Sequence, residues 1–123
     1  MSTPHEPDFD WAQAASLLGD DPDQVAGDMV DIVAELMENA DKQFKELKAR
    51  NAGTARKEIG AQAHQLRGSL LNFGFIAVGE ILLKIEKENY PPDDYPDLID
   101  SAEKVFVVSK KMLVDHYPSL RLP

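Results

Sequence analysis

The chain has 123 residues, of which 43% are hydrophobic and 28% charged, and this composition is typical of one soluble globular domain with a single core. Its net charge of −9 opposes nucleic acid binding, and the lack of cysteine excludes disulfides and thiolate metal sites. It has neither an apolar run of about 18 residues nor a basic N-terminal segment followed by an apolar one, so we expect a cytoplasmic protein without a membrane partner.

The N-terminal part predicts a tail and a short helix. Residues 1–8 show no apolar periodicity, so we expect a flexible tail followed by one domain over residues 9–123. Asp10 can cap a helix that starts at Trp11 and ends at Gly19. Because Trp11 shares a face with the apolar residues of this helix, we expect it to cover one end of the core.

A start signal precedes the first long helix. Asp21 is a predicted N-cap, with Pro22 in the first turn and Gln24 placed to close a capping box. The helical period then continues to Arg50. Residues 51–53, which include a glycine, predict the end of this helix, and Thr54 is a predicted cap for the next one.

Three more helices follow by the same criteria. The helix that Thr54 begins should end or kink at Gly74, and a further apolar stripe covers residues 78–85. After a loop at Pro91-Pro92, Pro96 opens a last helix that runs until Pro118. Four long amphipathic helices with short connections predict an all-α fold, an antiparallel up-down four-helix bundle with a short extra N-terminal helix.

One histidine lies opposite the buried face of its helix. The buried face is marked by apolar residues at steps of three and four: Ile59, Ala63, Leu66, Leu70 and Phe73. His64 points about 140° away from the centre of this stripe. We therefore expect its side chain to face outward.

The neighbours of His64 on the helix surface suggest that something must approach it. Gly60 and Gly68 stand one turn before and one turn after it, and a glycine within a helix costs about 1 kcal/mol relative to alanine. If both glycines face outward, the bare backbone leaves room for a second protein at the ring. Arg67 adds a fixed positive charge suited to a phosphoryl oxygen.

These residues resemble the histidine-containing phosphotransfer (HPt) family, whose motif is a histidine, any residue, leucine, lysine or arginine, glycine, then serine or alanine, with a glycine about ten residues after the histidine. The matching positions are Ala63, His64, Leu66, Arg67, Gly68, Ser69 and Gly74. One departure is that Leu70 and Leu71 stand where members often have small residues. Leu70 belongs to the buried stripe, whereas Leu71 is expected on the histidine face, where it would alter partner fit.

The resemblance implies a phosphocarrier in a multistep two-component phosphorelay. His64 would accept a phosphoryl group from an aspartate of a response-regulator receiver domain and pass it to another receiver, with Arg67 as electrostatic support and Gly68 providing clearance. Gly60, Gln65, Ser69 and Leu71 would contribute to partner binding. The attacking atom in the family is Nε2, and the receiver supplies its own Mg²⁺, so we expect no cofactor on this chain.

The remaining sequence offers no other chemistry. His5 lies in the expected tail, and His116 is interpreted as a partly buried structural residue at the edge of the last apolar stripe. The sequence has no Glu-x-x-His pair for a bundle metal site, and no glycine-rich phosphate loop. We therefore expect no metal, no use of ATP by the domain itself and no enzymatic activity of its own.

Two alternatives stay open at this stage. The chain could be a helical docking or adaptor module that binds receiver domains without carrying phosphate. It could also be the phosphotransfer segment of a larger hybrid sensor histidine kinase. If the chain is instead a separate protein, we expect a hybrid sensor histidine kinase to be one of its partners. Incubation with a phosphorylated receiver separates the first alternative from a phosphocarrier.

Overall fold

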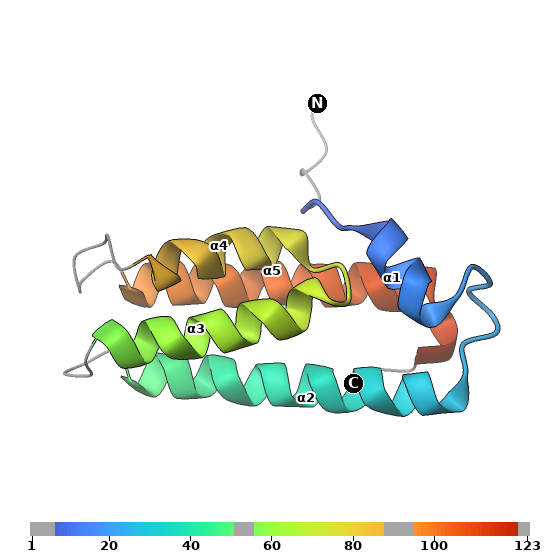
Figure 1. The fold of residues 1–123 in the computed structure, drawn as a ribbon, viewed down its shortest axis with the longest axis horizontal. Coiled ribbons are helices and arrows are strands. Elements are labelled where there is room, and N and C mark those ends of the chain that lie inside the picture. The colour runs from blue at the N-terminus through green and yellow to red at the C-terminus, as the bar shows by residue number, and fades with distance from the viewer. Residues whose placement is uncertain (1–6, 51–55, 88–94, 121–123) are drawn as a thin grey trace.

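A computed structural model describes residues 7–50, 56–87 and 95–120, and within these ranges the chain is helical with no strand. A short helix, α1 (Trp11–Leu18), precedes four longer ones (Figure 1): α2 (Gly27–Arg50), α3 (Arg56–Leu71), α4 (Ile76–Glu86) and α5 (Tyr95–His116). A 3₁₀ turn, η2 (Pro118–Leu120), follows α5. The predicted all-α class is thus confirmed. None of the described helices is both long and apolar enough to cross a membrane.

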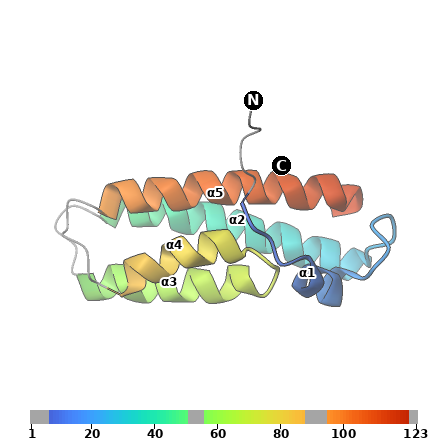
Figure 2. The ribbon, with the colours of Figure 1, turned by 90° about the horizontal axis from the view of Figure 1, so that it is seen from above.

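The four longer helices lie side by side along the longest axis of the molecule (Figures 1 and 2). Contacts link α2 with α3, α3 with α4, α4 with α5, and α5 with α2, so the four helices enclose one core. The helices α2 and α5 have 24 and 22 residues, whereas α3 and α4 have only 16 and 11. The two long helices therefore extend beyond the other two, and α1 packs at that end (Figure 1).

The core is formed by the apolar faces of these helices. Its aromatic centre joins three elements: the ring of Phe106 on α5 lies 5.4 Å from that of Phe44 on α2 and 5.7 Å from that of Phe75, just before α4. Every member of the predicted stripe of α3 is buried. Burying a large apolar side chain typically contributes about 1.5–3 kcal/mol, so this face fixes the rotation of α3 about its own axis.

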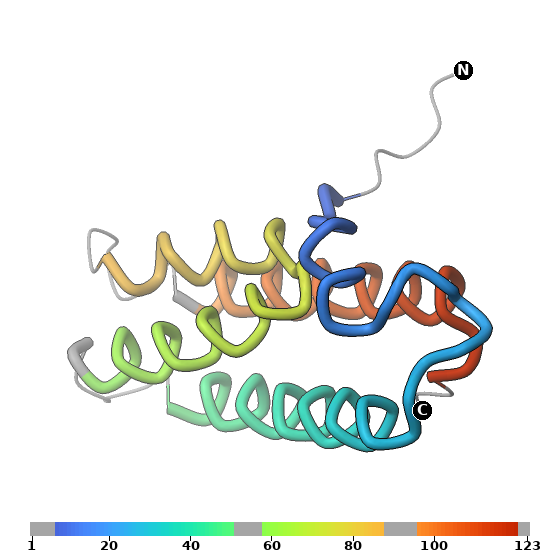
Figure 3. The backbone as a smooth tube through the Cα atoms, turned by 45° about the vertical axis from the view of Figure 1, so that its right-hand side comes forward, coloured from blue at the N-terminus to red at the C-terminus, as the bar shows by residue number. Residues whose placement is uncertain are grey.

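The N-terminal segment is anchored to the turn between α3 and α4 (Figure 3). The backbone N–H of Asp10 donates to the carbonyl of Gly74 at 2.9 Å. Gly74 has φ of +94°, and a Cβ there would lie 2.5 Å from the carbonyl oxygen of Asp10, so only glycine fits the turn. Asp10 also caps α1 by accepting from the N–H of Gln13. The predicted roles of Asp10 and of Gly74 as a helix end are confirmed.

The predicted start of the first long helix is wrong. Helix α2 begins at Gly27, and the side chain of Asp21 caps a local turn by accepting from the backbone N–H of Asp23 at 3.0 Å. The carbonyl of Pro22 accepts from Ser119 Oγ at 3.2 Å, which holds this segment against the C-terminal turn. Cap residues favour turns as well as helix starts, and here the path from α1 to α2 selects the turn.

The expected helix break at residues 51–53, the Thr54 cap and the Pro91-Pro92 loop lie outside the described residues, as does the tail up to residue 6. His116 was expected to be partly buried, but it is exposed. Its ring packs against that of Trp11 in a tilted arrangement, with centroids 4.6 Å apart and 41° between the ring planes, so this histidine contacts the tryptophan at the edge of the core.

Candidate functional site

Helix α3 presents His64 to solvent, as the sequence predicts. The stripe that includes Ala63 and Leu66 is completely buried, whereas the His64 side chain is 63% exposed. Since a residue's direction on a helix follows from its position in the 3.6-residue turn, burial of the stripe holds His64 outward. The exposed imidazole is therefore a consequence of the core packing.

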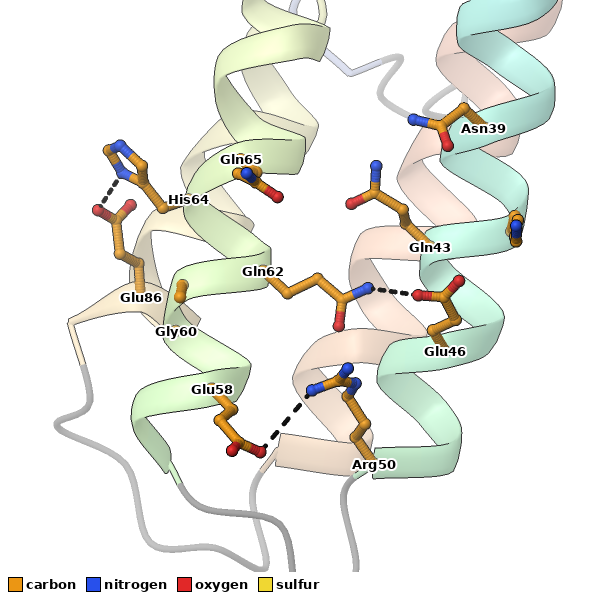
Figure 4. A pocket seen from close by; sticks show the side chains of 12 residues that line it. Asn39, Gln43, Glu46, Arg50, Glu58, Gly60, Gln62, His64, Gln65 and Glu86 are labelled. Atoms are coloured by element: carbon orange, nitrogen blue, oxygen red, sulfur yellow. Dashed lines mark hydrogen bonds and ion pairs between the residues drawn. The ribbon is translucent and has the colours of Figure 1, made fainter.

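A carboxylate from the next helix holds one edge of the imidazole. Glu86, the last residue of α4, has Oε1 2.5 Å from Nδ1 of His64, and the Nε–H of Arg67 donates to its Oε2 at 3.0 Å. An ionised carboxylate can only accept, so the Nδ1 atom carries the hydrogen in this contact. Figure 4 shows the other ring nitrogen facing away from Glu86. In the neutral ring that second nitrogen, Nε2, keeps its lone pair.

The protonation of Glu86 reflects opposing effects. Partial burial raises the pKa of its carboxyl, but the hydrogen bonds from His64 and Arg67, together with the positive charge of Arg67, outweigh burial and leave this pKa below its usual value. The carboxylate is therefore charged near neutral pH. Only 24% of either the Glu86 or the Arg67 side chain is exposed, so Arg67 is not the freely solvated charge that its position in the sequence suggested.

The two glycines that flank His64 differ in their surroundings. Gly68 is exposed, and a Cβ built on it meets nothing within 4 Å. Gly60, which was predicted to be equally open, is buried. The reason is the helical geometry. Viewed down the helix axis, Gly60 and Gly68 lie on opposite sides of His64 and point about 80° apart, and Gly60 lies on the same side as Arg67 and Leu71. That side is covered by α4.

A close approach of α3 and α4 forms this covered side. Gly79 of α4 is buried, and a Cβ there would lie 2.7 Å from Cδ2 of Leu71 and 3.7 Å from Cγ of Arg67. Leu71, predicted to lie on the partner-facing surface, is half-buried in this contact. Because Gly79 and Glu86 are seven residues apart, they share a face of α4. Leu71 and His64 are likewise seven residues apart on α3. The close approach of Gly79 to Leu71 therefore goes together with the contact of Glu86 with His64.

Helices α2 and α3 line a hollow of about 980 Å³, and His64 and Glu86 are also among its lining residues. The facing side chains are polar (Figure 4), and Gln62 Nε2 donates to Glu46 Oε2 across the hollow at 3.1 Å. Gln65, an expected partner contact, is exposed and lines the hollow, whereas Ser69 is half-buried. The described residues contain no group of three or more histidine, cysteine or acidic side chains that could hold a metal ion.

Glu86 is the site residue that sequence reasoning missed. The apolar period of its helix marks it as an outward charge beside Lys84 and Lys87, with nothing to distinguish it from them. Only the packing of α4 on α3 shows which outward residue meets His64. No spacing within the sequence could have identified it, because its partners lie 19 and 22 residues earlier on another helix.

Fold and site together define a helical domain that presents the imidazole of His64, held by Glu86, to solvent. A family model described as the Hpt domain matches residues 29–116, and the chain belongs to this family. Members act in histidine phosphotransfer within phosphorelays, are phosphocarriers and not kinases, and interact with receiver domains of two-component systems. No curated protein and no solved structure matches the chain. The N-terminal helix α1 precedes the matched region.

Proposed function

We propose that this chain is a phosphorelay intermediate that carries a phosphoryl group on Nε2 of His64. The observation that supports it best is the exposed His64 ring, whose Nδ1 is bonded to Glu86 so that Nε2 faces away with its lone pair available. The donor is an aspartyl phosphate on the receiver domain of a response regulator or of a hybrid sensor histidine kinase. A second receiver aspartate then takes the group from His64.

The transfer step requires no proton transfer. The Nε2 lone pair attacks phosphorus, a P–N bond forms, and the P–O bond to the aspartate breaks with its electrons leaving on the carboxylate. The ring retains its Nδ1 hydrogen and becomes positively charged, and the adjacent carboxylate of Glu86 compensates this charge. The same step in reverse delivers the group to the next receiver.

The partner supplies what this chain does not. In this proposal the receiver brings its acidic pocket and Mg²⁺, and the domain works without a cofactor, without ATP and in the cytoplasm. Gly68 leaves clearance for the receiver, with Gln65 beside it on the approach surface. We infer an antiparallel up-down bundle as the scaffold. The register of α3 and α4 supports it: Gly79 faces Leu71, whereas Glu86, seven residues later on α4, contacts His64, seven residues earlier on α3.

The test is phosphoryl transfer from a phosphorylated receiver to the purified domain. We expect an acid-labile, alkali-stable adduct that is lost in His64→Gln and retained in His116→Gln, the matched control at another exposed histidine. ATP with Mg²⁺ alone should give no label. Labelling of the His64→Gln variant would refute the assignment. If receivers bind tightly but no adduct forms, the chain is the docking module instead.

A further inference from the structure

A shallow hollow of about 330 Å³ lies where the start of α1 meets the last turn of α5, and Trp11, Met112, Asp115 and His116 line it. We propose that this hollow binds a soft monovalent metal ion of the Cu(I) class, ligated by the Met112 thioether and the His116 imidazole and covered by the Trp11 ring. The site is separate from His64 and does not depend on the phosphocarrier function. A thioether ligand falls outside the histidine, cysteine and acidic groups on which the expectation of no metal rests.

Met112 and His116 are placed to ligate one ion together. They are four residues apart on α5, so they lie on the same side of the helix, about 6 Å apart along its axis. The His116 ring is exposed, and Met112 is half-buried with three rotatable bonds that let its sulfur reach the ion. Thioether and imidazole groups suit soft ions such as Cu(I), whereas hard ions such as Mg²⁺ require oxygen ligands. This pair of ligands therefore favours a soft ion.

Trp11 supplies an aromatic cover for the ion. Its ring contacts that of His116 in the tilted arrangement described above, and both rings line the hollow. The face of an indole attracts a cation, and it does so more strongly where water is partly excluded. Asp115 adds a negative charge nearby, although its carboxylate accepts from Lys111 Nζ at 2.9 Å and is not needed as a ligand. The hollow thus combines two ligands for a soft ion with an aromatic face.

A metal ion bound here joins two helices that are far apart in the sequence. Trp11 begins α1, whereas Met112 and His116 belong to the end of α5. The other end of α1 meets the same region, because the hydroxyl of Tyr117 donates to the carbonyl of Gly19 at 3.0 Å. Metal binding should therefore hold α1 against the bundle and stabilise the folded protein, since a ligand that binds only the folded state favours that state.

The first test is a titration of the full chain with Ag⁺ in a chloride-free buffer, because Ag⁺ is a soft monovalent ion like Cu(I) but does not change its oxidation state under these conditions. Trp11 is the only tryptophan of the chain, so tryptophan fluorescence reports on this hollow. We expect saturable quenching that is complete at one Ag⁺ per chain. Emission that is unchanged, or quenching that never saturates, would overturn the proposal.

The second test changes the two ligands. Met112→Leu keeps the volume of the side chain but removes the sulfur, and His116→Gln removes the imidazole at an exposed position, so both variants should remain folded. We expect each to weaken Ag⁺ binding by about tenfold or more, since even residues that only orient a metal ligand contribute this much. Met29→Leu and His64→Gln are the matched controls, because they make the same changes outside the hollow. Parental affinity in the ligand variants, or equal losses in the controls, would mean that Ag⁺ binds elsewhere, against the proposal.

A third test distinguishes ligation from a purely structural role of Met112. In ¹³C NMR of the methionine methyl groups, Ag⁺ should shift the signal of Met112, identified by its loss in Met112→Leu, and leave that of the buried Met37 in place. Ag⁺ should also raise the melting temperature of the parent protein but not that of Met112→Leu. Mg²⁺ at the same concentration should do neither. A Met112 methyl signal that does not move with Ag⁺, or that moves equally with Mg²⁺, would exclude ligation by the thioether.

Discussion

Two glycines near His64 show how differently the two sides of its helix are used. Gly79 of α4 lies where α3 comes so close that a Cβ would overlap Leu71, whereas a Cβ on Gly68 of α3 meets nothing within 4 Å. The first glycine allows a close helix contact that brings Glu86 to the ring. The second leaves the approach to the ring open. The same residue type thus serves packing inside the protein and clearance outside it.

The largest effect on the fold is expected at Gly79, where α4 covers α3. Gly79→Leu places a bulky side chain against Leu71 and Arg67, and overpacking of this kind typically costs about 1–3 kcal/mol. We expect the free energy of unfolding in urea to fall by about 2–3 kcal/mol, and transfer to slow because Glu86 is moved away from His64. The matched control, Gly68→Leu at the open position, should be at least as stable as the parent. Equal stability of both variants would contradict a close contact.

Substitutions at Gly68, where α3 is open to solvent, should lower activity without lowering stability. Gly68→Gln gains up to about 1 kcal/mol because glycine is a poor helix former and the position is exposed. Its side chain stands one turn from His64, so receiver binding and phosphotransfer should fall by about tenfold or more. Gly68→Ala should share the gain in melting temperature with a smaller loss of transfer. Undiminished transfer in the glutamine variant would remove the clearance role.

Arg67 should contribute modestly to stability, because its side chain lies on the side of α3 that α4 covers. The sequence alone predicts a change within about 0.5 kcal/mol for Arg67→Ala, as is usual for an exposed charge. The structure predicts a loss nearer about 1 kcal/mol, since the side chain packs along α4 and pairs with a partly buried carboxylate. Arg50→Ala is the control, because Arg50 pairs with Glu58 at 3.8 Å in an exposed position. Equal, negligible losses in urea denaturation would favour the estimate from sequence.

The smallest effect is expected in the hollow between α2 and α3. Gln62 donates one hydrogen bond to Glu46, while its Oε1 is buried with no partner among the described residues. In Gln62→Met the lost hydrogen bond is offset by removal of an unpaired carbonyl, so stability should change by less than about 1 kcal/mol. Phosphotransfer should be unchanged, because Gln62 bonds to Glu46 on α2 and is not part of the hydrogen bonds that join His64, Glu86 and Arg67. A loss above about 2 kcal/mol would show that the polar contact holds the two helices together.

Much of the fold followed from local patterns. The buried stripe of α3 and the outward direction of His64 depend on the helical period alone, and Asp10 and Gly74 mark helix ends by residue type. The start of α2 was missed, although its signal at Asp21 was strong, because the same residues also suit a turn. A local signal is decisive only when no alternative local structure uses the same residues.

The sequence by itself determined that an exposed histidine stands on a helix with Gly68 open beside it, because these properties depend only on positions within one helix. Tertiary structure alone decided that Gly60 is buried and that Glu86 bridges His64 and Arg67. The physical reason is that both properties depend on the rotation and register with which α4 packs against α3, where Gly79 lies against the side chain of Leu71. Periodicity tells which residues of a helix face outward, but only packing decides which of them meet a neighbouring helix and which face solvent.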